Sequence, residues 1–168
     1  MILYHFTSGP HLRGIAKYGL TVGDVPTDIR RGRGRIGVWF TSSGDTASGH
    51  GLGGSKFNKG EYRLTVDVPA NSSLAKWSEW APTNTTRETI DALQRTASGY
   101  ESWYIFLGVV RPELIKSCHE VSSGLEIADY ENTLPAEFAV PAVPPWRREA
   151  WQKKMLASVK RAIEKHPV

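Results

Sequence analysis

The spacing of hydrophobic side chains predicts a chain of short strands and helices. Residues 61–68 alternate apolar and polar side chains, as a half-buried strand does, and residues 103–110 form the nearly continuous apolar run of a central strand. Further strands are predicted at residues 2–6, 36–43, 115–121 and 135–141, with a weaker one at 125–128. Apolar side chains at helical spacing predict helices at residues 10–18, 85–99 and 145–166. Gly and Pro interrupt residues 21–35, which are therefore predicted to form a loop.

Composition limits the classes of protein to which this chain can belong. Its 168 residues, 40% hydrophobic and 23% charged, predict one compact domain spanning residues 1–168. The lone Cys118 excludes an internal disulfide, and no histidine shows ligand spacing with acidic residues, so no metal is expected. No apolar run approaches the roughly 20 residues that cross a membrane, and the N-terminus does not resemble a signal peptide. We therefore expect a cytoplasmic protein without a membrane contact.

The first twenty residues combine a strand, a polar turn and a helix. Ser8 can cap the helix, Pro10 suits its first turn, and Gly19 can adopt the left-handed conformation that ends it. His5 then lies at the end of the strand, beside the free backbone amides of the turn. A lone histidine among apolar residues is more often structural than functional, so both interpretations of His5 stand at this point.

The segment Tyr-His-Phe-Thr-Ser, followed by a helix ending in Tyr-Gly-Leu, resembles the first motif of the ADP-ribosyltransferase superfamily. Poly(ADP-ribose) polymerases, DarT-type DNA ADP-ribosyltransferases and tRNA 2′-phosphotransferases are the nearest relatives in pattern. The resemblance implies that His5 holds the adenosine-side ribose of NAD and that the neighbouring backbone at Phe6 and Thr7 binds the nicotinamide amide. It also implies an α+β fold in which two packed, largely antiparallel sheets and flanking helices surround an NAD cleft.

A second segment, Gly-Val-Trp-Phe at residues 37–40, is similar to the Gly-Ile-Tyr-Phe segment of the poly(ADP-ribose) polymerases. The tyrosine of that family packs against the nicotinamide, and Trp39 occupies its place here. The resemblance also assigns NAD contacts to Thr41 and Ser42, at the end of the same strand. About eleven places further on, where the family carries an aromatic residue, this chain has His50, which would stack on nicotinamide less well than a tyrosine.

A third segment, Pro-Ala-Glu-Phe-Ala-Val-Pro at residues 135–141, supplies the candidate catalytic carboxylate. On a strand, Glu137 would lie among small and apolar residues, where an unpartnered carboxylate is costly, so it is a site candidate on physical grounds. The segment also resembles the Ala-Glu-Phe-Leu-Val segment that carries the catalytic glutamate of DarT-type enzymes. Pro135 stands where arginine-modifying enzymes usually have Glu or Gln, which disfavours an arginine acceptor.

Positive charge is concentrated in two segments. Arg30, Arg31, Arg33 and Arg35 alternate with glycines, and their guanidinium groups can bind phosphates in bidentate fashion; we assign the pyrophosphate of NAD to Arg31 and Arg33. Residues 145–168 hold seven Lys or Arg and two Glu, a local net charge of +5, so the rest of the chain carries −1. Both segments could also be ordinary solvent-exposed surface. The alternative interpretation of the terminal helix is an arm that binds nucleic acid.

These features predict an NAD-dependent ADP-ribosyltransferase that moves ADP-ribose from NAD to a macromolecular acceptor, with nucleic acid, DNA or RNA, favoured over protein. Breaking the bond between nicotinamide and ribose develops oxocarbenium character at the sugar carbon, which a carboxylate stabilises. Glu137 is the predicted stabilising group, His5 anchors the other ribose, and Trp39 walls the nicotinamide. As in a toxin, the expected partners include an inhibitory protein.

Three alternatives remain open. Because Trp39 and His50 depart from the family pattern, the protein could be a catalytically weak module that binds NAD or ADP-ribose. An NAD-dependent RNA 2′-phosphotransferase is the second alternative, although that branch lacks the catalytic glutamate. The third is a nucleic-acid-binding protein without chemistry, in which the basic helix supplies the affinity.

Overall fold

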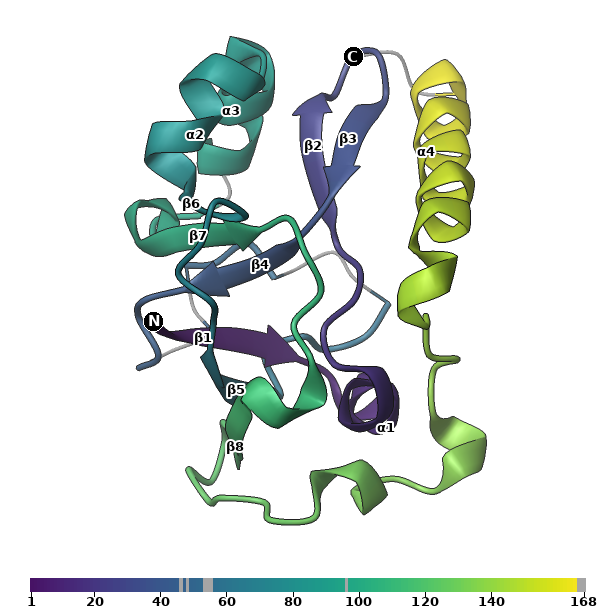
Figure 1. The fold of residues 1–168 in the computed structure, drawn as a ribbon. Helices are drawn as coiled ribbons and strands as arrows, with labels where there is room; N and C mark the ends of the chain where they lie inside the picture. The colour runs from purple at the N-terminus through teal and green to yellow at the C-terminus, as the bar shows by residue number, and fades with distance from the viewer. Residues whose placement is uncertain (46, 48, 53–55, 96, 166–168) are drawn as a thin grey trace.

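A six-stranded sheet and a separate two-stranded hairpin form the α+β fold of this chain (Figure 1). The computed structural model describes residues 1–45, 47, 49–52, 56–95 and 97–165. Every pairing between the described strands is antiparallel, in the order β6-β7-β4-β1-β5-β8. These strands are β1 (Ile2–Thr7), β4 (Val38–Thr41), β5 (Tyr62–Asp67), β6 (Leu74–Lys76), β7 (Trp103–Phe106) and β8 (Ile115–Glu120). The hairpin consists of β2 (Asp24–Asp28) and β3 (Arg33–Ile36).

Within the described residues, four α-helices accompany the strands: α1 (Gly9–Tyr18), α2 (Trp77–Asn84), α3 (Arg87–Arg95) and α4 (Arg148–Lys165). Short 3-10 turns lie between them at η1 (Tyr100–Ser102), η2 (Pro112–Leu114), η3 (Tyr130–Asn132), η4 (Ala136–Phe138) and η5 (Pro145–Arg147). The predictions of β1, α1, β4, β5, β7, β8, α3 and α4 are confirmed within a few residues. Gly19 has the predicted positive φ, 80°, but its ψ of −160° lies outside the left-handed helical region; its N–H donates to Ile15 O at 2.7 Å.

The sheet buries apolar side chains on both of its faces, because successive side chains of a strand point to opposite sides. On one face, hereafter the α1 face, Leu3 and Leu64 pack with Leu12 of α1 and are 0–1% exposed. On the other, hereafter the tryptophan face, Trp103 and Ile105 of β7 pack with Trp77 of α2. The two faces decide which predicted site residues can meet.

The prediction of a loop at residues 21–35 is wrong, because this segment forms the β2–β3 hairpin. Val25 is completely buried, and Gly32 supplies the positive φ of 61° that the turn requires. The Asp28 carboxylate accepts N–H bonds from Arg30 and Arg31, both at 3.1 Å, which fixes the turn. The hairpin extends beyond the six-stranded sheet, between α3 and α4 (Figure 1).

The prediction of a strand at residues 135–141 is also wrong. Residues 136–138 form the 3-10 turn η4, and Glu137 is exposed rather than enclosed by apolar neighbours. Flanking prolines lack the N–H groups that a strand ladder needs. The segment instead runs along the outside of α1, where Val140 N donates to Pro10 O at 2.9 Å and Ala142 contacts Gly14.

Two smaller expectations also change. Residues 125–128 form a single bridge, His119 with Glu126, rather than a strand. The predicted terminal helix begins as the turn η5 and continues as α4, and residue 166 lies outside the described residues. Arg148 fixes the start of α4 by donating to the carbonyls of Thr21 at 2.7 Å and Leu107 at 3.3 Å.

Candidate functional site

His5 has a fixed orientation on the α1 face of β1. Its Nδ1 lies 2.8 Å from the main-chain oxygen of Trp39, and its ring meets Phe40 edge-on, with centroids 5.8 Å apart. A carbonyl oxygen only accepts hydrogen bonds, so Nδ1 carries the hydrogen and Nε2 presents a lone pair. β1 and β4 pair at Tyr4 and Thr41. Next to this pair, the His5 ring forms its hydrogen bond to the main-chain oxygen of Trp39.

The charge state of His5 follows from the same surroundings. Burial lowers the pKa of His5 to about 4, the hydrogen bond that His5 donates to the Trp39 carbonyl opposes this, and the charges of Lys59 and His11 lower the pKa further. The ring is therefore neutral at pH 7. A neutral imidazole with Nδ1 occupied accepts a hydrogen bond at Nε2, which suits a hydroxyl group such as that of a ribose and does not suit a phosphate oxygen.

A polar cluster that the sequence analysis missed lies beside His5, at the start of α1. Ser8 Oγ and His11 Nδ1 are 2.6 Å apart, and Gly9 N donates to Glu61 Oε2 at 3.3 Å. Burial lowers the pKa of His11, and the charge of Lys59 lowers it further. The spacing of Ser8 and His11, three residues apart at a helix start, was a usable signal. Glu61 had no such signal, because its contact depends on the pairing of β5 with β1.

Trp39 lies on the opposite side of the sheet from His5. Its register partner is Ile105, its ring centroid lies 4.9 Å from that of Trp77 and 5.5 Å from that of Trp103, and its Nε1 donates to Asp24 O at 2.7 Å. These contacts are those of a packed side chain. His5 and Trp39 therefore touch through the Trp39 main chain, and the structure does not bring their rings together.

The other predicted NAD contacts divide between the same two faces. Phe6 stacks on His50 with centroids 5.8 Å apart, and Trp103 Nε1 donates to His50 Nδ1 at 3.2 Å, both on the tryptophan face. Thr41 Oγ1 lies 2.7 Å from a hydroxyl of η1, that of Ser102, and the Ser42 N–H donates to the Ser102 carbonyl at 2.9 Å. Thr7 is buried and follows His5 on the α1 face.

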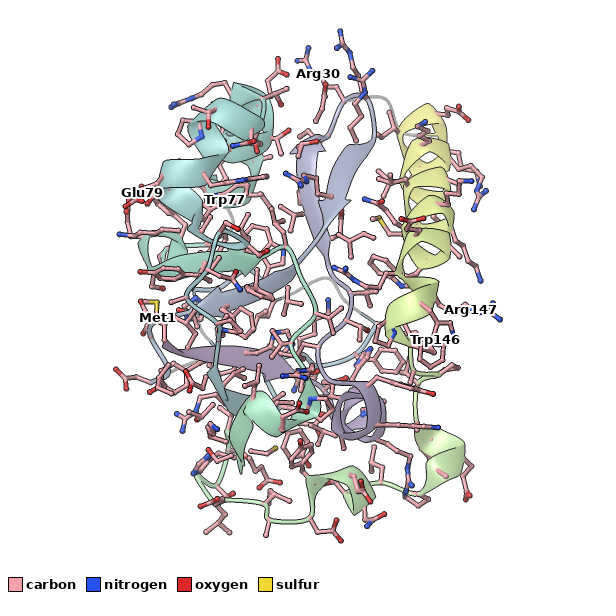
Figure 2. The ribbon with its side chains drawn as sticks, in the orientation of Figure 1. Met1, Arg30, Trp77, Glu79, Trp146 and Arg147 are labelled. Atoms are coloured by element: carbon pink, nitrogen blue, oxygen red, sulfur yellow. The ribbon has the colours of Figure 1, made fainter. Side chains whose placement is uncertain are left out.

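The remaining predicted residues lie apart from His5. Arg31 and Arg33 are exposed at the tip of the hairpin, where Arg31 lies 3.8 Å from Asp28. Figure 2 labels the neighbouring Arg30 at the end of the hairpin remote from the sheet, where its guanidinium lies 3.3 Å from the Glu88 carboxylate of α3. Glu137 lies on the segment that covers α1. The structure thus brings together His5 and Thr7 with the unpredicted cluster of Ser8, His11, Lys59 and Glu61.

Two surface hollows, one of about 330 Å³ and one of about 450 Å³, are lined by none of these residues. Within the described part of the chain, no group of three His, Cys, Asp or Glu side chains could hold a metal ion. Among the described helices, none is both long and apolar enough to cross a membrane.

No family model, no curated protein and no solved structure matches this chain.

Proposed function

We propose that the protein is an NAD-dependent ADP-ribosyltransferase. The observation that supports the proposal is the state of His5, a neutral imidazole whose Nδ1–H is bonded to Trp39 O and whose Nε2 is an acceptor. This is the form of histidine that accepts a hydrogen bond from a sugar hydroxyl, the role that the first motif implies. The α+β fold with antiparallel pairing is compatible with the proposal.

In the proposed reaction, the bond between the ribose C1′ and the nicotinamide nitrogen breaks, and the nicotinamide leaves as a neutral molecule with the bonding electron pair. The ribose carbon then bears oxocarbenium character. A nucleophilic atom of the acceptor bonds to this carbon and loses its proton. Glu137 is the proposed stabiliser of the cation, and His5 holds the other ribose so that the dinucleotide is oriented.

The exposure of Glu137 favours a second candidate function. A carboxylate in water stabilises a nearby cation far less than a desolvated one does. Substrate or acceptor must therefore cover Glu137 if it is to act in catalysis. If neither does, the chain is a module that binds NAD or ADP-ribose. Nothing on the described surface favours the RNA 2′-phosphotransferase alternative specifically.

We propose nucleic acid as the acceptor, because residues 145–168 carry a net charge of +5 and the hairpin tip adds exposed arginines. Cationic surfaces gain affinity for DNA and RNA through release of counterions. The acceptor is identified by incubating the protein with labelled NAD and separate pools of DNA, RNA and cell protein. Label on nucleic acid supports the proposal, and label confined to protein contradicts it.

Release of nicotinamide separates the enzyme from the binding module. We expect Glu137→Gln to lower the rate of release by about 100-fold or more, the size of effect of one group that stabilises transition-state charge. Glu131→Gln is the matched control, since Glu131 is exposed on the same connecting segment. Equal rates in both variants would remove Glu137 from the site. A wild-type protein that binds NAD without releasing nicotinamide would favour the binding module.

A further inference from the structure

The most exposed of the large apolar side chains described is that of Trp146, at 74% relative accessibility. Its ring meets Tyr18 of α1 edge-on, with centroids 5.7 Å apart and planes at 89°. This single ring contact leaves most of the indole in solvent. Because an exposed tryptophan is energetically unfavourable in water, its position at the surface needs an explanation.

Two cations lie near this ring in the fold. Arg147, the next residue, is exposed, and Lys17 Nζ lies 5.1 Å from the centroid of the Tyr18 ring. Trp146 and Arg147 project together from the base of α4 (Figure 2). An exposed aromatic ring with cations nearby can stack a base while the cations contact neighbouring phosphates.

The backbone at Trp146 is held in place. The ring belongs to η5, which begins at Pro145, and two residues further on the Arg148 side chain donates to the carbonyls of Thr21 and Leu107. An anchored ring loses little conformational entropy when a ligand stacks on it. The exposed ring is thus presented by a fixed element rather than by a free chain end.

α4 continues the cationic surface from Arg147. Its inner side contacts the hairpin, where Gln152 Nε2 donates to Gly34 O at 3.1 Å and Lys160 lies against Gly32. None of its residues, all of which are described, is buried. At 100° per residue, Lys154, Arg161 and Lys165 share the side opposite Gln152, and all three are exposed. This cationic row extends along a helix about 27 Å long.

We propose that Trp146 and the outer row of α4 bind a single-stranded polynucleotide, with one unpaired base stacked on the indole and the phosphates lying along Arg147, Lys154 and Arg161. The proposal deepens the acceptor part of the proposed function by naming the strand state and the surface. Single strands are favoured over duplexes because only an unpaired base offers a free face to the ring. The outer side of α4 lacks large apolar side chains that could enter a membrane, which disfavours a lipid surface as the partner. The cationic row complements the charge of phosphates and the exposed indole can stack on a base, and together they favour a polynucleotide.

The test measures binding by the full chain without NAD, using fluorescence anisotropy. The probes are labelled oligothymidylate and oligouridylate of about 12 nucleotides, within the range of known single-strand sites, and a DNA duplex of the same length. We expect single strands to bind more tightly than the duplex. Trp146→Ala should lower single-strand affinity roughly 5- to 150-fold, the range for loss of one stacked base. Trp146→Phe should retain most of it, and Leu125→Ala, which removes another highly exposed apolar side chain, should change nothing.

Charge and fluorescence supply independent readouts. Replacing Lys154 and Arg161 by Gln should flatten the slope of log affinity against log salt by about 1.4, since single strands contribute about 0.7 per phosphate contact. The matched pair Arg95→Gln and Lys116→Gln, both exposed elsewhere, should leave the slope unchanged. The oligonucleotide should quench wild-type tryptophan emission, and this quenching should largely disappear in Trp146→Phe.

The inference is overturned if Trp146→Ala binds single strands like the wild type, or if the duplex binds as tightly. It is also overturned if vesicles of anionic lipid or polyglutamate bind as tightly as the oligonucleotides. Nicotinamide release without acceptor is measured on the same proteins, so the two proposals fail separately. If nicotinamide is released but substitution of Trp146 does not weaken oligonucleotide binding, only this inference is overturned. If an oligonucleotide stacks on Trp146 but the protein releases no nicotinamide, only the proposed enzymatic function is overturned.

Discussion

The replacement of His5 by Asn tests the state of the histidine on which the proposed function depends. Asn is uncharged at every pH, and its side-chain amide can donate to Trp39 O as Nδ1–H does. The variant therefore keeps the hydrogen bond and removes the titration. The perturbation separates the structural role of His5 from its protonation.

The magnitude follows from the shift in pKa, from 6.5 in the unfolded chain to about 4 in the folded protein. Between these values the unfolded state binds more protons than the folded state does, so stability falls as the pH falls. At 1.36 kcal/mol per unit, this group lowers the free energy of unfolding by about 3 kcal/mol between pH 6.5 and 4. This contribution to the pH dependence fades above pH 6.5 and is negligible by about pH 8.

Urea unfolding of wild type and His5→Asn at several pH values between 4 and 8 measures the effect. Contributions from other groups, such as His11 and Asp24, are present in both proteins and cancel in the comparison. We expect the wild type to lose about 3 kcal/mol more than the variant on acidification. Parallel pH profiles would refute the neutral state of His5. Calorimetric titration adds the functional readout, in which the dissociation constant of NAD for the wild type should not follow a titration between pH 5 and 8.

Three further substitutions or modifications test the packing around the candidate site. Gly19→Ala should lower the free energy of unfolding by about 2 kcal/mol or more, since φ is 80° and the new Cβ would lie 1.9 Å from Val110 O; an unchanged urea midpoint would contradict this. Burial raises the pKa of Cys118 to about 11, so a thiol reagent should modify it only after denaturation, and rapid labelling of the native protein would contradict its burial. Trp39→Phe should lower the free energy of unfolding by about 1 kcal/mol, because the hydrogen bond to Asp24 O is lost. The affinity for NAD, measured by calorimetric titration, should not change. A weaker affinity would indicate that the indole contacts the nicotinamide.

Sequence patterns predicted the elements whose stabilising contacts are local or periodic. The alternation at residues 62–67 needs only one buried face, and α1 is bounded by the local signals Pro10 and Gly19, although the Ser8 hydroxyl bonds to His11 instead of capping the helix. The β2–β3 hairpin was missed because glycine, proline and aspartate, which are frequent in residues 21–35, have low strand propensity. Its pairing depends on Val25, which α2 and β7 bury, and on α3, whose Thr89 hydroxyl accepts the N–H of Ile29 at 3.0 Å.

The segment at residues 135–141 shows the opposite failure. Its alternating apolar residues fit a strand, but a strand also needs a neighbour with free backbone groups. The edge of the sheet nearest in sequence, β8, is followed by the turns that carry the chain toward α1. Phe138 is consequently 63% exposed, and the burial argument for Glu137 no longer applies.

The faces on which the predicted site residues lie depend on register, which no single segment encodes. Both strands of the His5 and Trp39 motifs were predicted, yet their pairing at Tyr4 and Thr41 decides that the two rings point to opposite sides. Because the backbone of β1 and β4 separates the rings, a ligand that contacts both must pass around the ends of these strands. Under the proposed function, a dinucleotide held at His5 Nε2 without such a path would lie along the start of α1, beside His11 and Lys59. The structure therefore makes this part of the α1 face the surface on which NAD binding is best sought.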